Sequence, residues 1–304
     1  MTTHGDQIFQ FGGVPVASAS GAQVFGNHWF VDNVRGLSAN SGKKSTSPVS
    51  TVAEAIALAS AGDTIYVNAT GTDYEESSTL ALDRVNIIGC AASPREVGWT
   101  PSATNGTCLV ITGKGCRVSG IGFRPNGATT GYAIDLQDDA AGTKAYNTVI
   151  DNCYFRSTVA TAKAAILCNG VPENVRIIGN HFTHCNYAIN NDTASNKPAY
   201  GWHIIGNHFS SKLTTGVRLS ASRCRVLYNT FAGPGGLDTV GYSAAVGNLG
   251  NNQIFMNSFG GDYGIATGKF KFNATDNFTG NYAFDVAAST EVNATTGEVK
   301  AIPV

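Results

Sequence analysis

Hydrophobic and polar residues alternate in short blocks along most of the chain, and six of these blocks end in a phenylalanine. The segment NVRIIGNHF at 174–182 recurs as GWHIIGNHF at 201–209, with six consecutive residues unchanged. The phenylalanines are Phe123, Phe155, Phe182, Phe209, Phe231 and Phe259. Five residues before each of them stands a β-branched residue, namely Val118, Ile150, Ile177, Ile204, Val226 and Ile254. The intervals between the phenylalanines are 32, 27, 27, 22 and 28 residues, which indicates a repeated structural unit of variable length.

A second apolar column follows each phenylalanine after a variable gap and is centred on Ile134, Ile166, Ile189, Val217, Val246 and Ile265. Each repeat therefore predicts two or three short strands joined by turns of glycine and asparagine, with no helix per repeat. This pattern predicts an all-β chain that forms a right-handed, single-stranded parallel β-helix. In such a solenoid the strands of successive coils hydrogen-bond about 4.8 Å apart, so that equivalent side chains stack.

We expect about seven to nine coils, with the phenylalanine and isoleucine columns inside. Asparagine at the turns is expected to take the left-handed backbone conformation. Its amide is also expected to hydrogen-bond with the equivalent amide of the next coil. Differences in repeat length then correspond to loops added at the turns, where extra length costs little.

Residues 29–76 carry a different pattern, WFVDNVRGLSANSGKKSTSPVSTVAEAIALASAGDTIYVNATGTDYEE. The apolar residues at helical spacing are Val52, Ala55, Ile56 and Ala59. Ser50 or Thr51 can cap the start of this short helix. The order of FVD, NSG, SP, AI, GDTIYV and GT resembles the N-terminal segment of pectin-lyase-like right-handed β-helix proteins. The resemblance implies a helix that covers the open end of the first coil, but no particular activity, because lyases, hydrolases, adhesins and viral spikes share this fold.

These patterns divide the chain into four parts. Residues 1–28 lack periodicity and predict an extended N-terminal arm. Residues 29–80 predict the first segment of the β-helix with its capping helix, and residues 81–282 predict the coils. Residues 283–304 predict a C-terminal cap or a subunit contact, with a hairpin around Asn293–Gly297.

Composition and charge exclude several classes of protein. The 20 Lys and Arg against 21 Asp and Glu give a formal net charge of −1, so no global field recruits nucleic acid or an anionic membrane. No stretch approaches the roughly 20 apolar residues of a membrane span. The seven cysteines are an odd number and include no CxxC pair, which indicates buried free thiols rather than a disulfide scaffold or a zinc site.

Two histidines, His181 and His208, occupy the same repeat position, one residue before the phenylalanine. They are expected to stack on adjacent coils and are the candidate metal ligands. A structural or catalytic metal site needs three or four ligands, and no matching column of cysteine or carboxylate accompanies them. We therefore expect outward-facing imidazoles, no bound metal and no other cofactor.

Carboxylates are the candidate catalytic groups. Hydrolases of this fold place two carboxylates about 5–9 Å apart, and the resemblance implies clustered acids with Ca²⁺ and a basic residue for lyases. Asp135 and Asp151 each follow an inward isoleucine and should face outward, so they are the fallback catalytic candidates. Asp138 and Asp139 fit a turn in QDDAAG. No second carboxylate stacks in the column of Asp135, which continues as Leu167, Asn190, Arg218 and Gly247.

A basic column lies six residues before each phenylalanine. It reads Arg117, Val149, Arg176, His203, Arg225 and Gln253. Because it alternates with the inward column, it should face outward. We predict that its basic members, Arg117, Arg176, His203 and Arg225, form a subunit-contact stripe that meets acidic turns of a neighbour. The alternative is a solvated sheet face in which intervening residues keep the charges apart.

The arm sequence GDQIFQFGGVPVASA, at 5–19, supplies the candidate partner-binding residues Phe9, Phe11, Val14, Pro15 and Val16. The N-terminus lacks the basic and continuous apolar regions of a secretory signal, so we expect synthesis in a bacterial host cytoplasm. With that expectation and the GGVPV segment, the chain resembles a structural component of a bacteriophage virion.

The resemblance implies a non-enzymatic capsid decoration or spike protein, located in the virion. We expect a homotrimer that docks through the N-terminal arm on another virion protein such as the capsid shell. Low charge, 13% of residues, suits a protein that buries surface in an assembly. Two alternatives stay open: a tail spike or fibre that binds or cleaves a host surface glycan, and a stand-alone polysaccharide lyase.

Overall fold

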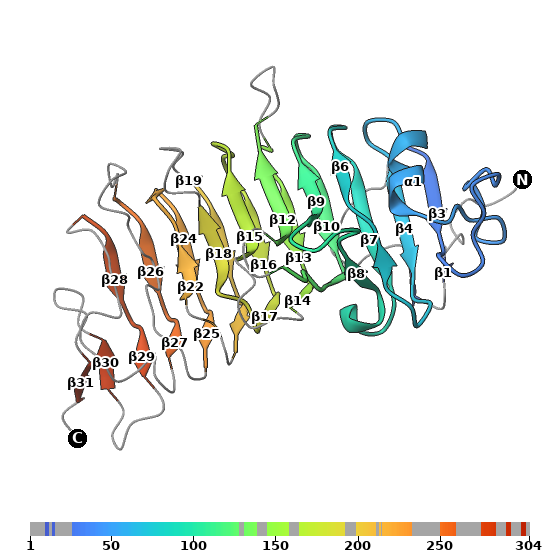
Figure 1. Cartoon of the computed structure of the whole chain (residues 1–304). Coiled ribbons are helices and arrows are strands. Elements are labelled where there is room, and N and C mark those ends of the chain that lie inside the picture. Colours follow the sequence, from blue (N-terminus) through green and yellow to red (C-terminus); the bar gives the residue numbers. More distant parts are fainter. Residues whose placement is uncertain are drawn as a thin grey trace, which may run out of the picture.

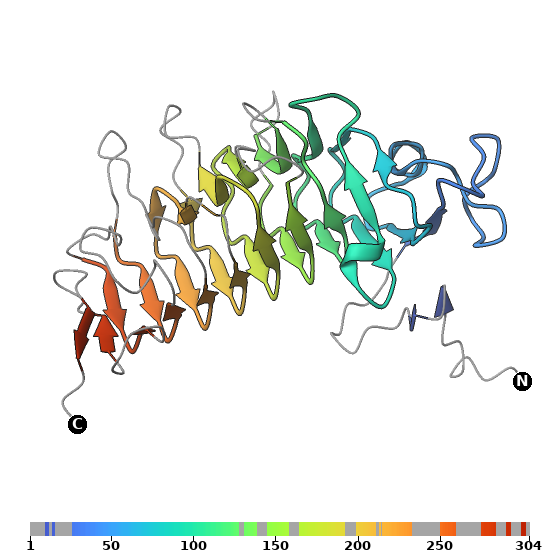
Figure 2. The ribbon, with the colours of Figure 1, turned by 60° about the horizontal axis from the view of Figure 1, so that its bottom comes forward.

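The computed structural model of the chain describes residues 10–11, 14–15, 26–127, 131–138, 145–157, 164–191, 199–210, 213, 215–232, 250–259, 275–283, 290–292 and 299–301, and all structural statements refer to these residues. Its short strands stack side by side into an elongated solenoid that runs from β3 to β28 (Figure 1). A second view shows the sheets as separate layers wound around the same axis (Figure 2). The fold is a right-handed parallel β-helix, as the repeats and the N-terminal segment predicted.

Three long sheets make the walls of the solenoid. The ten-stranded sheet is entirely parallel and consists, in spatial order, of β28 (Asn277–Thr279), β26 (Gln253–Phe255), β24 (Arg225–Leu227), β20 (His203–Ile205), β16 (Arg176–Ile178), β13 (Val149–Asp151), β10 (Arg117–Ser119), β7 (Asn86–Cys90), β4 (Thr64–Asn68) and β3 (His28–Val31). The six-stranded sheet is also parallel and consists of β22 (Thr215–Arg218), β18 (Tyr187–Asn191), β15 (Ala164–Asn169), β12 (Tyr132–Gln137), β9 (Thr107–Ile111) and β6 (Ser78–Leu80).

The eleven-stranded sheet is parallel except at its C-terminal end. It consists of β31 (Val299–Ala301), β30 (Thr290–Val292), β29 (Tyr282–Ala283), β27 (Ser258–Phe259), β25 (Thr230–Phe231), β21 (His208–Phe209), β17 (His181–Thr183), β14 (Tyr154–Arg156), β11 (Gly122–Phe123), β8 (Gly98–Thr100) and β5 (Tyr74–Glu75). β30 pairs antiparallel with both β29 and β31. The strands beside the expected hairpin therefore pair as a hairpin requires, and its turn, residues 293–298, lies outside the described residues.

The remaining four strands form two separate two-stranded sheets. β1 (Gln10–Phe11) and β2 (Val14–Pro15) pair antiparallel, and β19 (Ala199–Tyr200) and β23 (Ala221–Ser222) pair parallel. A single turn of 3₁₀ helix, η1 (Pro94–Glu96), follows β7. No helix among the described residues combines the length and the hydropathy that crossing a membrane requires.

The phenylalanine column is the continuous centre of the core. All six rings are fully buried, and neighbouring ring centroids lie 4.4–5.3 Å apart with interplanar angles of 12° or less. The β-branched column five residues earlier is also buried, as are Ile134, Ile166, Ile189 and Val217 of the second column. These inward assignments are confirmed, while Val246 and Ile265 lie outside the described residues.

An asparagine ladder lines the turn between the ten-stranded and eleven-stranded sheets. The Nδ2 atom of each asparagine donates to Oδ1 of the next at 2.8–3.0 Å, through Asn180, Asn207, Asn229, Asn257 and Asn281. The expected amide ladder is confirmed, but the expected conformation is wrong for this column. The left-handed residue is the one before each asparagine, because that residue makes the corner and leaves the amide free to point inward.

The helix α1 (Val52–Leu58) covers the first coils, and its capping is stronger than the sequence pattern indicated. Thr51 and Glu54 form a reciprocal capping box. The carboxylate of Glu76, 24 residues beyond Val52, accepts the backbone N–H groups of Val52 and Ala53 at 2.8 Å each. The sequence predicted the helix with Ser50 or Thr51 as its cap, and the structure assigns the cap to Thr51. The contact with Glu76 was not predicted, because it joins different coils.

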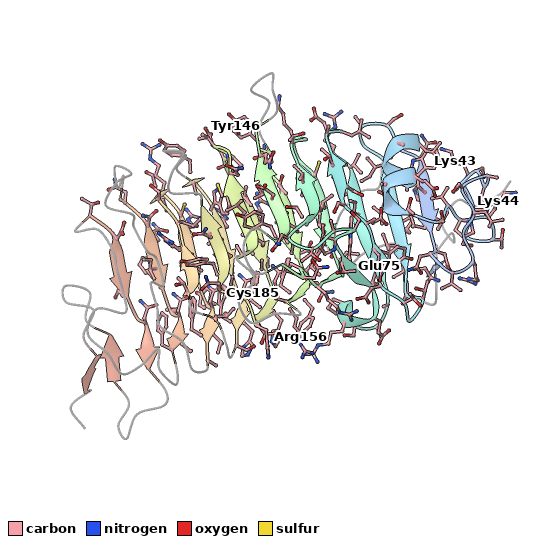
Figure 3. The ribbon with its side chains drawn as sticks, viewed as in Figure 1. Lys43, Lys44, Glu75, Tyr146, Arg156 and Cys185 are labelled. Carbon is pink, nitrogen blue, oxygen red and sulfur yellow. The ribbon has the colours of Figure 1, made fainter. Side chains whose placement is uncertain are left out.

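All seven cysteines are free and buried. Burial raises the pKa of the Cys185 thiol to about 12, and Figure 3 shows this side chain among the strands, away from the outer edge where Arg156 points outward. A neutral, buried thiol is neither a nucleophile nor a metal ligand. The cysteines therefore pack as small apolar residues, as the sequence predicted.

Candidate interaction surface

The outward face of the ten-stranded sheet carries two columns of side chains, because each three-residue strand points its central residue inward. The first residues of four successive strands form the polar column already noted, Arg176, His203, Arg225 and Gln253. The third residues form an apolar column, Ile178, Ile205, Leu227 and Phe255. Apolar side chains thus stack on the outside of the solenoid beside a polar column that contains two arginines.

The apolar column reaches solvent. The exposed fraction of Ile178 is 36%, and Ile205, Leu227 and Phe255 are half-buried. At the adjoining turns Tyr228 and Met256 are 60% and 54% exposed. We call the six residues Ile178, Ile205, Leu227, Phe255, Tyr228 and Met256 the apolar stripe. We take this apolar surface as the candidate interaction site.

Backbone conformation sets Tyr228 and Met256 apart from their neighbours. Their φ angles are 56° and 52°, in the left-handed region that is strained for bulky residues. The equivalent turn positions in the neighbouring coils are occupied by glycine, at Gly179, Gly206 and Gly280. The chain therefore holds two large apolar side chains at corners where glycine would be relaxed. Strain of this kind is typical of functional positions.

The basic stripe is shorter than the sequence indicated. Arg117 is bound by Asp151, with Nε–Oδ1 and Nη2–Oδ2 distances of 2.9 and 2.7 Å. By contrast, Arg176 and Arg225 are exposed and form no ion pair within the described residues. Burial lowers the pKa of His203 between them, and the charges of Arg225 and Arg176 lower it further. The uncompensated stripe therefore consists of Arg176, His203 and Arg225.

The two fallback catalytic carboxylates lie on different sheets. Asp151, on the ten-stranded sheet, is occupied by Arg117 and also accepts the Ser119 hydroxyl at 3.3 Å. Asp135, on the six-stranded sheet, alternates with the inward isoleucine as predicted, but it is only 4% exposed. Its Oδ2 accepts the Gln137 amide at 2.5 Å. The burial of Asp135 could not be predicted from the sequence, because it depends on which residues cover the outer face of the sheet.

The remaining acidic residues of this region, Asp138 and Asp139, were expected to lie in a turn. Asp138 lies in a β-bridge rather than in the expected turn, and its Oδ1 atom accepts the backbone N–H of Val171 on the next coil at 3.0 Å. Asp139 lies outside the described residues. The column of Asp135 continues through Leu167, Asn190 and Arg218, as the repeat alignment predicted. Gly247 lies outside the described residues.

His181 and His208 stack on adjacent coils as predicted, with ring centroids 4.8 Å apart and rings at 62°. The ring centroid of Tyr154, on the preceding coil, lies 5.2 Å from that of His181, and Nε2 of His181 lies 3.1 Å from the Ser210 hydroxyl. Burial lowers the pKa of His181 to about 4, with further contributions from His208 and Arg95. Among the described residues no group of three side chains could hold a metal ion.

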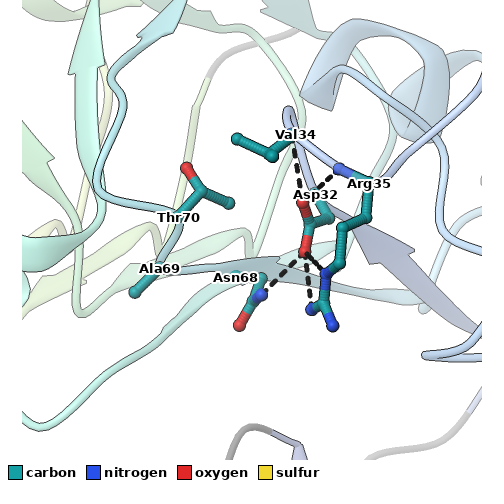
Figure 4. Close-up of a pocket in the computed structure, with 6 residues that line it drawn as sticks. All are labelled: Asp32, Val34, Arg35, Asn68, Ala69 and Thr70. Carbon is teal, nitrogen blue, oxygen red and sulfur yellow. Dashed lines mark hydrogen bonds and ion pairs between the residues drawn. The ribbon is translucent and has the colours of Figure 1, made fainter.

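A small open pocket lies where β3 leaves the first coil (Figure 4). It has a volume of about 220 Å³ and is lined by Asp32, Val34, Arg35, Asn68, Ala69 and Thr70. Burial raises the pKa of Asp32, but hydrogen bonds from Arg35, Asn68 and Val34 outweigh it and hold the pKa below its usual value. Because both carboxylate oxygens are bound in this way, Asp32 fixes the loop rather than reacting.

The partner-binding role expected for residues of the N-terminal arm stays a prediction. Phe9 and Val16 lie outside the described residues. Phe11, Val14 and Pro15 belong to the β1–β2 pair, whose backbone alone is described. The apolar stripe, by contrast, was missed although the alignment contained its signal. Four residues before the last four phenylalanines stand Ile178, Ile205, Leu227 and Phe255.

Comparison with known proteins adds little beyond the fold. No family model and no curated protein matches the sequence. A pectin methylesterase from rice weevil is 12% identical, with a TM-score of 0.49 over 83% of this chain and 80% of that one. A rhamnogalacturonan lyase is 11% identical, with a TM-score of 0.42 over 77% and 68%. The Dettilon tailspike protein is 13% identical, with a TM-score of 0.28 over 76% and 63%. Since all three TM-scores lie below 0.5, the fold assignment rests on the strand register of this chain.

Proposed function

We propose that this chain is a non-enzymatic structural protein of a bacteriophage particle, of the capsid-decoration or spike type. One observation carries the proposal: the ten-stranded sheet presents the apolar stripe to solvent over four successive coils. The outer face of a solvated sheet is normally polar, so an apolar column there serves contact with another macromolecule. The phage setting rests on the resemblance of the N-terminal arm to virion proteins.

A cleavage assay tests the non-enzymatic part of this proposal. The full chain is incubated with a panel of neutral and acidic polysaccharides, and reducing ends and the ultraviolet absorbance of unsaturated products are followed. We expect no product above that of the heat-inactivated chain, since Arg117 occupies Asp151 and Asp135 is buried. Product that disappears in Asp151→Asn or Asp135→Asn, and persists in the control Asp138→Asn, would replace the proposal by an enzymatic one.

One observation favours a second candidate, a tail spike that binds or cleaves host glycan. Tyr154, His181 and His208 form a row of rings on the outer face of the eleven-stranded sheet, and the Arg95 guanidinium lies 4.3 Å from the Tyr154 ring centroid. Rings with polar edges offer both apolar contact and hydrogen bonds to a sugar. This candidate predicts glycan binding that replacement of the half-exposed His208 by alanine removes, whereas the structural proposal predicts none.

Deletion of residues 1–25 is expected to abolish docking on the partner virion protein and to leave the β-helix folded. The first strand of the solenoid, β3, begins at His28, and the sequence of the arm lacks the periodicity of the coils. Co-sedimentation with phage particles measures docking, and circular dichroism during heating measures folding. A truncated chain that fails to fold would assign the arm to the core instead.

The assembled form is expected to be a homotrimer. The long sheets expose flat faces with few charges, and cyclic association buries such faces without generating open filaments. Light scattering on the purified chain should return the mass of three subunits over a range of protein concentrations. The mass of a single subunit at the highest concentration would show that the sheets are simply solvated.

A further inference from the structure

We infer that the apolar stripe, together with Arg176, His203 and Arg225, docks an amphipathic helix of a different protein, one that carries carboxylates beside its apolar face. The inference deepens the proposed function, on which it rests, by naming the chemistry of the partner at this surface. Four features of the stripe support it: the charge beside it, its area, its repeat distance and its strained corners.

Charge indicates a partner other than a second copy of the chain. Arg176 and Arg225 are exposed without an ion pair among the described residues, and their repulsion reaches the intervening His203. In a parallel cyclic assembly, coils of equal height meet. Over the described parts of 164–232, which hold Arg176, His203 and Arg225, the one carboxylate is Glu173. A second copy thus offers poor compensation, whereas a partner with its own row of carboxylates neutralises the stripe.

The area of the stripe suits a helix better than a globular face. Four coils with a spacing of about 4.8 Å, each exposing the outer side of a short strand and its corner, give a surface on the order of 300 Å². A stable contact between two globular proteins needs roughly 800 Å² on each partner. The stripe alone is therefore too small for a subunit interface, but it matches the apolar face of three to four turns of helix.

The repeat distance of the stripe also fits a helix. Successive turns of an α-helix are about 5.4 Å apart, close to the coil spacing of about 4.8 Å. Over the three intervals from Ile178 to Phe255 the mismatch accumulates to roughly 2 Å, less than half a repeat. Apolar residues on consecutive turns can therefore meet consecutive coils, while acidic residues on one flank lie over the basic stripe.

The strained corners point to the same surface. Tyr228 and Met256 keep left-handed backbone conformations at positions that are glycine in neighbouring coils. A Cβ atom built at Gly179 or Gly206 meets nothing within 4 Å, so these corners face open space. Tyr228 and Met256, which are 60% and 54% exposed, therefore extend the apolar surface outward at these corners. We therefore assign Tyr228 and Met256 to binding of the partner. Glycine at these two positions should relax the strained backbone.

Synthetic peptides test the inference on the full chain. The probe is a labelled amphipathic helix of about 14 residues, with leucines on one face and glutamates on one flank. The comparison peptide has lysine in place of each glutamate. We expect fluorescence anisotropy to report binding of the acidic peptide and at least about tenfold weaker binding of the basic one. Binding of the acidic peptide should weaken as salt is added.

Variants locate the site. The double variant Tyr228→Gly with Met256→Gly should bind the acidic peptide at least about tenfold more weakly, with a melting temperature equal to or above that of the unchanged chain. Arg176→Glu should weaken binding similarly, whereas the matched control Arg156→Glu, exposed on the eleven-stranded sheet, should not. If Tyr228 and Met256 served only the fold, their replacement would lower the melting temperature. Weaker binding without a lower melting temperature therefore indicates a role in binding.

Three outcomes overturn the inference: no binding of the acidic peptide, equal binding of both peptides, or binding that the stripe variants leave unchanged. Light scattering supplies a fourth outcome. If the double variant Tyr228→Gly with Met256→Gly turns an oligomer into a monomer, then a second copy of the chain occupies the apolar stripe. The glycan assay separates this inference from the proposed function. Cleavage of a polysaccharide by a chain that still binds the peptide would remove the proposed function and leave the docking surface standing.

Discussion

Replacement of Phe209 by alanine is expected to lower the free energy of unfolding by about 3–5 kcal/mol. The ring is fully buried, and its centroid lies 5.0 Å from that of Phe182 and 4.4 Å from that of Phe231. Removing it deletes apolar contacts on both sides and leaves a cavity between two rings. The backbone pairing of β21 with β17 and β25 holds those rings at the coil spacing, so the cavity cannot collapse.

Chemical denaturation followed by circular dichroism measures this loss. The matched control is Phe255→Ala, because Phe255 lies on the outer face of the same solenoid and is half-buried. Its loss should cost clearly less than that of Phe209. Equal destabilisation by the two variants would contradict the assignment of the phenylalanine column as the centre of the core.

Replacement of Asn207 by alanine is expected to lower the free energy of unfolding by about 3 kcal/mol or more. It leaves several buried polar groups without a hydrogen-bond partner, and each such group costs about 1–3 kcal/mol. Its Oδ1 accepts both the backbone N–H and the Nδ2 of Asn180, at 2.9 and 3.0 Å. Its Nδ2 donates to the Ile177 carbonyl and to Oδ1 of Asn229, at 2.8 and 3.0 Å. The side chain therefore joins three successive coils at one corner.

The matched control is Asn86→Ala, since Asn86 lies on the outer face of the ten-stranded sheet and its amide makes one side-chain hydrogen bond, to Thr64 at 3.2 Å. We expect this control to cost less than about 1 kcal/mol. Thermal melts of both variants measure the difference. A melting temperature for Asn207→Ala as high as that of the control would mean that water replaces the ladder, and that the buried amides are not a source of stability.

The fold could be predicted because the register of a stacked solenoid is visible in the sequence as a repeat. Equivalent residues of successive coils lie on top of one another, so each buried column appears as a repeat, as with Phe182 and Phe209. The same logic predicted the stacked imidazoles of His181 and His208. It also predicted the outward direction of Arg176 and Arg225, because alternation along a strand is a local property.

The rest could not be predicted, because it depends on contacts that do not repeat. Asp151 neutralises Arg117 across adjacent strands, and Glu76 caps a helix that lies 24 residues earlier. Neither pairing recurs in the other coils as far as the structure describes them, so no column reveals it. The apolar stripe is a different case: its residues stood in register, but alternation alone predicts polar side chains on an outer face.

The unbroken asparagine and phenylalanine columns have a consequence for how this molecule can change over evolutionary time. Because each coil contacts only the coils before and after it, a whole coil is the smallest piece that can be gained or lost without interrupting either column. Excision of residues 183–209 would join equivalent points of two coils and shorten the solenoid by one spacing of about 4.8 Å. The near-identical segments at 174–182 and 201–209 are what a recent duplication of one such piece would leave. The length of the solenoid thus changes by whole coils, whereas loops at the turns change only the number of residues in a coil.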